Sequence, residues 1–138
     1  MKLYDVYLNK KEKYYNYVVM IESGIFYETF DKDSVIINKL VGYKILNNSN
    51  KLRLGFPSGV LNKVILELKV NHINYLVISK NGEILKKKYK DNNYDSYISD
   101  FNYYINIDNR IDLIYNKLKL KMKDDNIDNI LSGIEKVL

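Results

Sequence analysis

The first part of the chain alternates β-type runs with apolar positions at helical spacing. Residues 14–21 and 25–30 are rich in β-branched and aromatic side chains, and the turn Glu22-Ser23-Gly24 between them predicts a pair of strands. Apolar positions then recur every three or four residues. This spacing predicts a short helix that begins after the capping side chains of residues 31–34 and ends at Gly42.

A hairpin and a second helix are expected next. Residues 43–46 and 52–55 flank the polar run 47–50, whose asparagines tolerate turn conformations, so these segments predict two paired strands. Ser58 is expected to cap the helix that follows. The apolar stripe of that helix has a clear helical period and consists of Val60, Leu61, Val64, Ile65 and Leu68.

The second half begins with another hairpin and ends in helices. An apolar run over residues 75–79 and the turn Asn81-Gly82 predict two strands, which complete the order β-β-α-β-β-α-β-β. After a polar loop, helical spacing resumes around residues 111–122 and over residues 127–138. Residues 117–123 alternate lysine with apolar side chains and fit a strand equally well, so this segment is left open between helix and strand.

Length and composition agree with a single core. With 138 residues and 46% hydrophobic content, the expected fold class is α/β, a central mixed β-sheet flanked by helices over residues 1–92. Residues 93–138 are expected to form a helical C-terminal extension that packs on the same domain. The absence of cysteine excludes disulfides and thiolate zinc sites. With no apolar signal segment or bilayer-length run, the sequence predicts a soluble, cytoplasmic protein without membrane contact.

Charge points to a polyanionic partner. The formal net charge is +5, and residues 1–69 carry eleven basic and seven acidic side chains, so a nucleic-acid surface is expected in the first half. Lysines in hairpins also commonly protect sheet edges, which is the alternative role for these residues. The candidate phosphate contacts are Lys51, Arg53, Lys86, Lys87 and Lys88. His72, the only histidine, is expected to cap a helix end rather than to act as a ligand or base.

Two motifs carry a resemblance to a known family. The segment Gly24-Ile25-Phe26-Tyr27-Glu28 resembles the Gly-x-Phe-Tyr-Glu motif of the MutS family, with a strand before it and a helix after it as in that family. The turn Gly55-Phe56-Pro57-Ser58, its helix and the strand over 73–78 are similar to the family's Gly-Val-Pro turn, helix and strand. The resemblance covers residues 12 to 80 or so and implies the fold of the MutS mismatch-recognition domain (domain I), here as a stand-alone domain.

The resemblance also implies roles for two residues. In MutS relatives the Phe of this motif wedges beside a mispaired base and the Glu hydrogen-bonds to that base, which gives these roles to Phe26 and Glu28. Strand alternation independently places both side chains on one face and Tyr27 on the other. Ile25 stands where most bacterial relatives carry a polar or charged residue, which leaves the DNA-facing geometry open.

Catalysis is not expected. The glycines at 55 and 59 are followed by Val60 and Leu61 and do not form a P-loop, which predicts ATP independence. One histidine and no cysteine exclude the usual catalytic triads and most zinc hydrolases. Asp124, Asp125 and Asp128 could serve magnesium chemistry, but acidic clusters at a helix start are commonly caps. Neither a cofactor nor a metal is therefore expected.

The sequence leaves two functions open. The first is a non-catalytic, nucleic-acid-binding module of DNA repair that binds mispaired, distorted or bent double-stranded DNA and would associate with the nucleoid. The second is a MutS-like fold that serves as a protein-interaction or dimerisation module through its C-terminal helices, without binding DNA.

Overall fold

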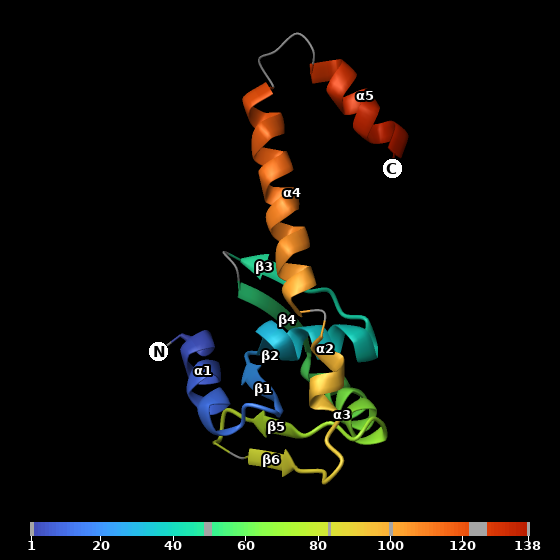
Figure 1. Cartoon of the computed structure of the whole chain (residues 1–138). Coiled ribbons are helices and arrows are strands. Elements are labelled where there is room, and N and C mark those ends of the chain that lie inside the picture. Colours follow the sequence, from blue (N-terminus) through green and yellow to red (C-terminus); the bar gives the residue numbers. More distant parts are fainter. Residues whose placement is uncertain (1, 49–50, 83, 100, 122–126, 138) are drawn as a thin grey trace. The chain divides into compact units, whose positions relative to one another are not determined.

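Figure 1 shows the computed structural model of the chain, which describes residues 2–48, 51–82, 84–99, 101–121 and 127–137. It divides into two compact units, Met1–Asn102 and Tyr103–Leu138. The first unit contains the β-sheet and the helices that cover it. The second contains most of α4 (Phe101–Lys121) and all of α5 (Ile127–Val137).

The first unit is built on a six-stranded mixed sheet with the order β3-β4-β2-β1-β5-β6. All neighbouring strands are antiparallel except β1 and β5, which are parallel because the chain returns to the sheet through a helix. The predicted fold class and the predicted order of strands and helices from β1 to β6 are confirmed. The strands are β1 (Val18–Ser23), β2 (Phe26–Phe30), β3 (Leu46–Asn48), β4 (Lys51–Pro57), β5 (Tyr75–Ile78) and β6 (Ile84–Lys87).

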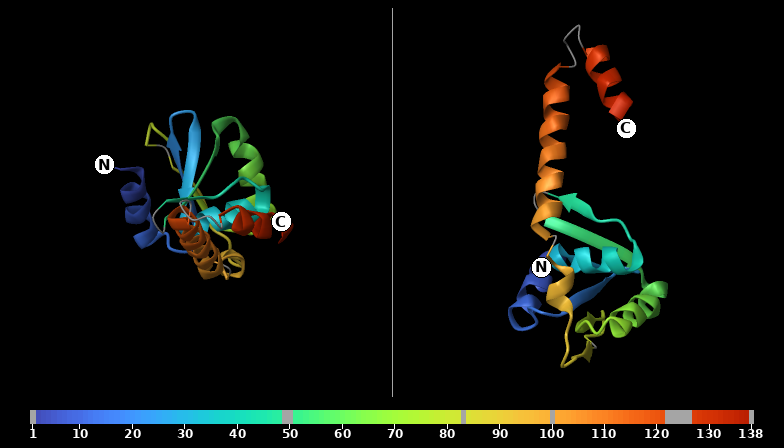
Figure 2. Two further views of the ribbon diagram at one scale, coloured as in Figure 1. Left: turned by 90° about the horizontal axis from the view of Figure 1, so that it is seen from above. Right: turned by 45° about the vertical axis from the view of Figure 1, so that its right-hand side comes forward.

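Helices cover both faces of this sheet. On one face lie α2 (Asp31–Val41) and α3 (Leu61–Val70), which enclose a core that includes Met20, Phe56 and Leu68. On the opposite face, α1 (Leu3–Lys13) packs against the strands around buried residues such as Tyr7, Val19 and Leu76. Figure 2 shows α1 and α3 on opposite sides of the strands.

Two short 3-10 helices add to these elements, and α1 itself was not expected from the sequence. The 3-10 helix η1 (Ser58–Val60) precedes α3, and η2 (Tyr94–Tyr97) lies in the segment expected to be a polar loop. The face of α1 that packs on the sheet combines Leu3 and Val6 with Tyr4 and Tyr7, and the hydroxyl groups of the two tyrosines weaken the apolar signal. Helical amphipathicity is therefore harder to see in this segment than in α3.

The turn predictions are mostly confirmed and the cap predictions are partly wrong. Gly42 ends α2 in the left-handed conformation (φ 80°), and Gly24 and Gly82 occupy positive-φ positions in the two expected turns. Ser58 does not cap α3, because it begins η1 and makes no side-chain cap bond. Residues 31–34 do not precede α2 as caps either, because the helix begins at Asp31 and its N-cap residue is Phe30, which makes no side-chain cap bond. The Asp31 and Asp33 carboxylates instead accept hydrogen bonds from tyrosines of α1.

A buried polar network ties α1 to the rest of the unit. The Asp33 carboxylate is fully buried on α2 and accepts hydrogen bonds from the hydroxyls of Tyr7 (2.8 Å) and Tyr94 (2.6 Å) and from the Val19 amide (3.1 Å). The Lys11 ammonium lies 3.1 Å from the same carboxylate. Burial raises the pKa of Asp33 and lowers the pKa of Lys11, so the protein interior disfavours each charge alone. These contacts hold α1, α2, β1 and η2 together.

The second face of the sheet is covered only in part. The core beneath α1 contains Val19, Ile21, Phe30 and Leu76 from the neighbouring strands, and no residue of the β1–β2 turn. The end of β2 near Phe26 is exposed, whereas the rest of that strand is buried. The sheet thus presents one uncovered end on the same side as α1.

The second unit is helical in its described residues. Of the segment 117–123, which the sequence left open between helix and strand, residues 117–121 belong to α4, and residues 122 and 123 lie outside the described residues. Ile111, Ile114 and Tyr115 follow one another at helical spacing on α4, and each is more than half exposed. None of the described helices is long and apolar enough to cross a bilayer. Asp124 and Asp125 lie outside the described residues.

Candidate nucleic-acid interface

The tip of the β1–β2 hairpin presents two apolar side chains to solvent. Gly24 has a φ of 60° and makes the tight turn that glycine favours. The next two residues are Ile25, which is 73% exposed, and Phe26, which is 44% exposed. The Ile25 carbonyl accepts a hydrogen bond of 2.8 Å from the Ser58 amide, so the tip is tied to the chain just after β4. The two exposed side chains therefore stand on a braced backbone.

Residues along β2 alternate between the two faces, as expected. The Tyr27 ring enters the core and stacks on Phe56, with 6.0 Å between ring centroids, and it is only 7% exposed. Phe26 and Glu28 lie on the opposite face, where they line the same pocket. The predicted orientation of these three side chains is confirmed.

The pocket beside Phe26 has a volume of about 500 Å³ and forms at the uncovered end of the sheet. Gly55 lies opposite Glu28 in the pairing of β4 with β2 and contributes no side chain that could cover it. The lining residues were not all expected as site residues, because two of them come from the loop between α2 and β3 and a third is the first residue of β3. The pocket is lined by Phe26, Glu28, Tyr43, Lys44, Leu46, Arg53 and Gly55.

Glu28 is buried and paired. Its side chain is 8% exposed, and its Oε1 accepts a hydrogen bond of 2.6 Å from Arg53 Nε. A second guanidinium nitrogen of Arg53 also contacts this oxygen. The Arg53 side chain remains 46% exposed, so the positive end of the pair faces the pocket. The sequence suggested Arg53 only as a phosphate contact and gave no signal of this pairing, because the two residues are 25 positions apart.

The structure does not gather the other candidate lysines around Phe26. The Lys51 ammonium lies 4.6 Å from the centroid of the Tyr4 ring, near the N-terminal end of α1. Strand β6 is separated from β2 by two strands, so Lys86, Lys87 and Lys88 belong to the opposite edge of the sheet. The candidate phosphate contacts therefore fall into two separate regions.

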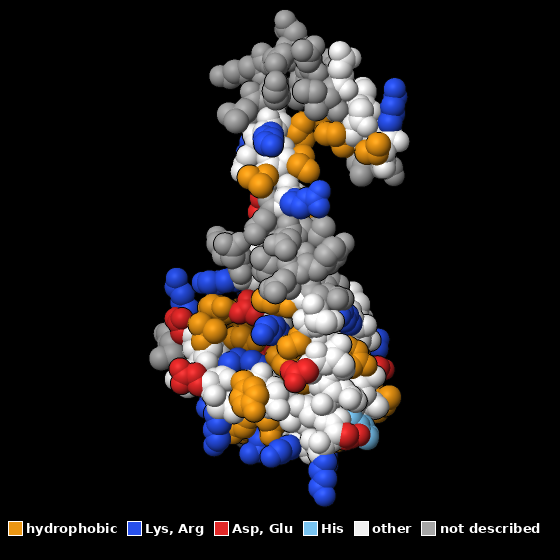
Figure 3. Space-filling view, viewed as in Figure 1, with side chains coloured by type: hydrophobic (Ala, Val, Ile, Leu, Met, Phe, Trp, Pro, Cys, Tyr) orange, Lys and Arg blue, Asp and Glu red, His pale blue; other side chains and the backbone are white. Residues whose placement is uncertain are grey.

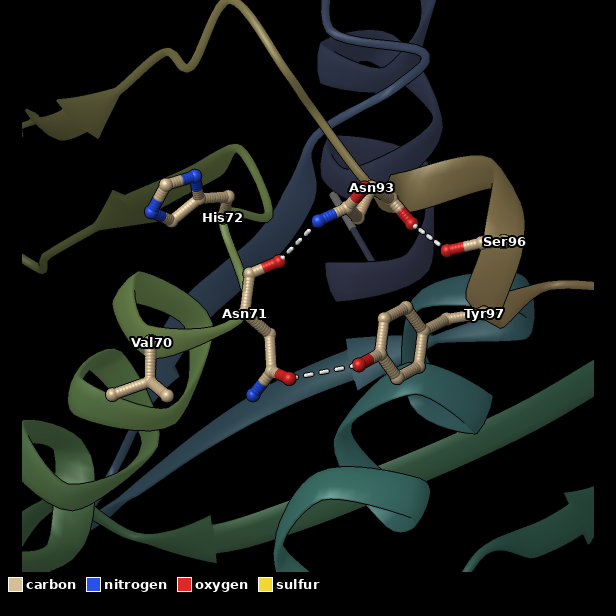
Figure 4. A pocket seen from close by; sticks show the side chains of 6 residues that line it. All are labelled: Val70, Asn71, His72, Asn93, Ser96 and Tyr97. Carbon is tan, nitrogen blue, oxygen red and sulfur yellow. Dashed lines mark hydrogen bonds between the residues drawn. The ribbon is translucent and has the colours of Figure 1, made fainter.

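A second pocket, of about 440 Å³, lies between the end of α3 and η2 (Figure 4). Its polar groups bond mainly to each other: the Tyr97 hydroxyl donates to Asn71 Oδ1 (2.8 Å), and the Asn93 amide donates to the Asn71 carbonyl (2.9 Å). His72 ends α3 through its backbone, as a capping residue, because its φ is 52° and its amide donates to the Lys69 carbonyl (3.1 Å), and its side chain makes a different contact. Its ring is 2.6 Å from Asp91, and this hydrogen bond lowers the pKa of the Asp91 carboxyl group. The polar groups that line this pocket are thus largely hydrogen-bonded to one another.

The part of the chain that the structure describes contains no candidate metal site. Among these residues, no three histidine, cysteine or acidic side chains come close enough together to hold an ion. The chemistry available at the Phe26 pocket is therefore that of an aromatic ring, a paired carboxylate and exposed cations.

Comparison with known proteins agrees with this fold. A search of curated proteins finds no match to the chain. The family model for MutS domain I matches residues 2–92, which include the whole sheet, α1, α2 and α3. This range contains the Gly-x-Phe-Tyr-Glu segment and the Gly-Phe-Pro turn that carried the resemblance. Because the match covers well over half of the 138 residues, the chain belongs to the MutS domain I family.

Proposed function

We propose that the protein is a non-catalytic module that binds double-stranded DNA and prefers mispaired or distorted sites, with Phe26 as a wedge and Glu28 as a hydrogen-bond acceptor. Family membership supports contact with DNA. The observation that carries the proposal is the exposure of the Phe26 ring, which stands 44% exposed at a braced hairpin tip while every other residue of β2 is buried. Phe30 lies on the same face of β2 but is buried in the core beneath α1, whereas Phe26 lies at the end of the strand outside that core.

An aromatic wedge selects defective pairing through the cost of unstacking. Inserting an apolar side chain between base steps costs a few kcal/mol, and this cost is lowest where the base pair is already weak. Ile25 adds an exposed apolar side chain next to Phe26, so the inserted surface is wider than one ring. The preference for mispaired DNA then follows from the difference in unstacking cost between the two duplexes.

The ion pair between Glu28 and Arg53 changes how the pocket beside Phe26 interacts with DNA. A bare carboxylate would be repelled by the phosphates of any duplex, but Arg53 neutralises it and leaves a positive group exposed at the pocket. A displaced base with a donor group can then approach the carboxylate, whereas intact pairs keep their donors within the duplex. Glu28 thus contributes specificity more than affinity.

Binding by this domain alone should be weak and sensitive to salt. Phosphate contacts release counterions, so affinity falls steeply as salt concentration rises. The test is fluorescence anisotropy with the full chain and two labelled duplexes of the same sequence, one matched and one with a central mispair, from low to physiological salt. Tighter binding to the mispaired duplex supports the proposal, and equal binding to both contradicts mispair recognition.

We further propose that binding requires no ATP and serves DNA repair in the cytoplasm.

Glu28→Gln should reduce the preference for mispaired DNA by strengthening the binding of matched duplex. The change removes the negative charge but keeps an acceptor oxygen, and it frees the Arg53 guanidinium to contact phosphate. We expect matched duplex to bind several-fold more tightly. The free-energy preference for mispaired over matched duplex should fall by about 1–3 kcal/mol at most, the usual range for one specific contact. Anisotropy titrations of both duplexes measure this ratio. Arg53→Gln is the partner variant and should weaken binding to both duplexes, and a lower affinity of Glu28→Gln for matched duplex would contradict the model.

The second candidate function is an interaction module that uses the C-terminal helices. The observation that favours it is the exposed stripe of Ile111, Ile114 and Tyr115 on α4, since exposed apolar patches often mark protein contacts. Under this alternative neither duplex binds. That residues 93–138 pack on the first unit also stays a prediction.

Ile111→Glu combined with Ile114→Glu should test that candidate. If α4 mediates self-association, sedimentation or light scattering of the wild-type chain should give more than one chain mass, and the double variant should return it to a single chain. Negative charge in an apolar contact is costly, which is the physical reason for the expected dissociation. A wild-type chain that is already monomeric at high protein concentration would exclude dimerisation through α4.

A further inference from the structure

We propose that a basic groove at the opposite end of the sheet from Phe26 binds the phosphate backbone of the same DNA duplex. The inference rests on the proposed function but assigns a separate site. The groove has a volume of about 370 Å³ and is formed by the end of α1, the segment leading into β1 and the edge strand β6. Its principal side chains are Lys13, Tyr14, Tyr15, Tyr17, Lys86 and Lys88.

Charge is the first argument for an anionic ligand. The described residues that line the groove include three lysines and no acidic side chain. The ammonium groups of Lys13 and Lys86 lie 5.5 and 5.6 Å from the centroid of the same Tyr14 ring, so two positive charges from distant parts of the chain are placed around one ring. Because like charges repel each other, an anion bound between them would lower the energy of the arrangement.

The aromatic residues supply a firm support and a free polar group. The Tyr14 ring packs edge-to-face on Tyr17, with 5.1 Å between centroids, and Tyr17 is only 9% exposed. The Tyr14 ring that attracts both lysines is therefore anchored to the core beneath α1. Tyr15 is 71% exposed, and tyrosine hydroxyls are common donors to phosphate oxygens. Figure 3 shows basic side chains gathered over β6 and the adjoining end of α1, beside exposed hydrophobic ones.

The groove and Phe26, the candidate wedge, lie on the same side of the sheet. Lys86 pairs with Leu76, whose side chain packs beneath α1, and strand pairing places Glu28 on the same side of the sheet, opposite Ile21. The groove lies at the start of β1, whereas Phe26 pairs with Ser23 at its end, so the two sites are separated by about 17 Å along the six-residue strand. Since one turn of B-DNA spans roughly 34 Å, a single duplex can reach both.

The test compares two double variants with equal loss of charge. Lys13→Gln with Lys86→Gln removes the cations over Tyr14, and Lys63→Gln with Lys69→Gln removes two exposed lysines of α3 on the other side of the sheet. Surface substitutions of this kind change stability little, and circular dichroism checks the fold. Affinity for matched and mispaired duplexes is measured by anisotropy between about 50 and 200 mM salt.

We expect the groove variant to bind both duplexes several-fold more weakly, with an unchanged ratio between them. The slope of log affinity against log salt should fall by about 2, because each lost phosphate contact removes roughly 0.9. The control variant should keep the wild-type slope apart from a small general effect of charge. If both variants give the same slope and affinity, the groove proposal is wrong.

Failure of the groove and failure of mispair recognition give different results. Wild-type binding that depends on the groove but is equal for matched and mispaired duplex supports the groove and contradicts the wedge. If the wild-type chain prefers mispaired duplex but the groove variant keeps the wild-type salt slope, the wedge is supported and the groove is contradicted. If the wild-type chain binds neither duplex at low salt, both proposals are wrong.

Discussion

Phe26→Ala is expected to abolish the preference for mispaired duplex while leaving binding to matched duplex nearly unchanged. The ring is partly exposed, so its removal costs the fold little, but it is the group that would enter the base stack. Contacts between an aromatic side chain and a base are worth about 1–3 kcal/mol by alanine substitution, which corresponds to roughly 5- to 150-fold in affinity. Anisotropy titrations of the two duplexes at one salt concentration measure the change.

Leu66→Ala is the matched control for this experiment. Leu66 is 57% exposed on α3, which covers the other face of the sheet, so its loss removes exposed apolar surface away from the candidate interface. This variant should keep the wild-type ratio of affinities. If Phe26→Ala and Leu66→Ala behave alike, Phe26 is not a wedge. Ile25→Ala should fall between them, because Ile25 widens the apolar tip without contributing a ring.

Asp33→Ala is expected to cause the largest loss of stability. The variant leaves Lys11 buried without its acid and leaves the hydroxyls of Tyr7 and Tyr94 without their acceptor. Removing one partner of a buried ion pair costs about 3–5 kcal/mol, a large part of the stability of an ordinary domain. For a domain of this size, Tm should fall by roughly 10–20 °C or more. Thermal and urea denaturation followed by circular dichroism measure the loss, and Asp95→Ala, at an exposed aspartate of η2, is the control.

The pH dependence of Lys11→Met tests the same network from the other side. Burial already raises the pKa of Asp33, and Lys11 is the main group that opposes this shift, so its removal should raise that pKa further. A carboxyl group whose pKa is higher in the folded than in the unfolded state loses stability as pH rises from the unfolded value through the folded value. The stability deficit of Lys11→Met should therefore be small near pH 4 and grow as pH rises toward neutrality. A constant deficit would mean that Asp33 does not depend on Lys11.

Local patterns predicted the parts of this fold that depend on neighbours in sequence. The alternation in β2 placed Phe26 and Glu28 on one face and Tyr27 on the other, and Gly42 and Asn81-Gly82 marked a helix end and a turn through their backbone preferences. The sequence motif led to the family, which the family model confirms. These features share one cause, since each is set within a few residues along the chain.

The features that the sequence did not reveal depend on partners far apart in the chain. Asp33 was expected to cap α2, but it binds groups from α1, β1 and η2 at separations of 14 to 61 residues. The Glu28–Arg53 pair joins β2 to β4 in the same way. Helix α1 was missed because tyrosine contributes both apolar surface and a hydroxyl, so its buried face did not stand out as hydrophobic.

The hydrogen bond between the Ser58 amide and the Ile25 carbonyl bears on the thermodynamics of the proposed complex. A loop that must become ordered on binding loses conformational entropy, whereas a tip fixed before the encounter does not. The protein side of the interface then contributes little to the entropy change, and deformation of the double helix is left as the dominant cost. Discrimination among lesions would follow from how easily each one bends and unstacks.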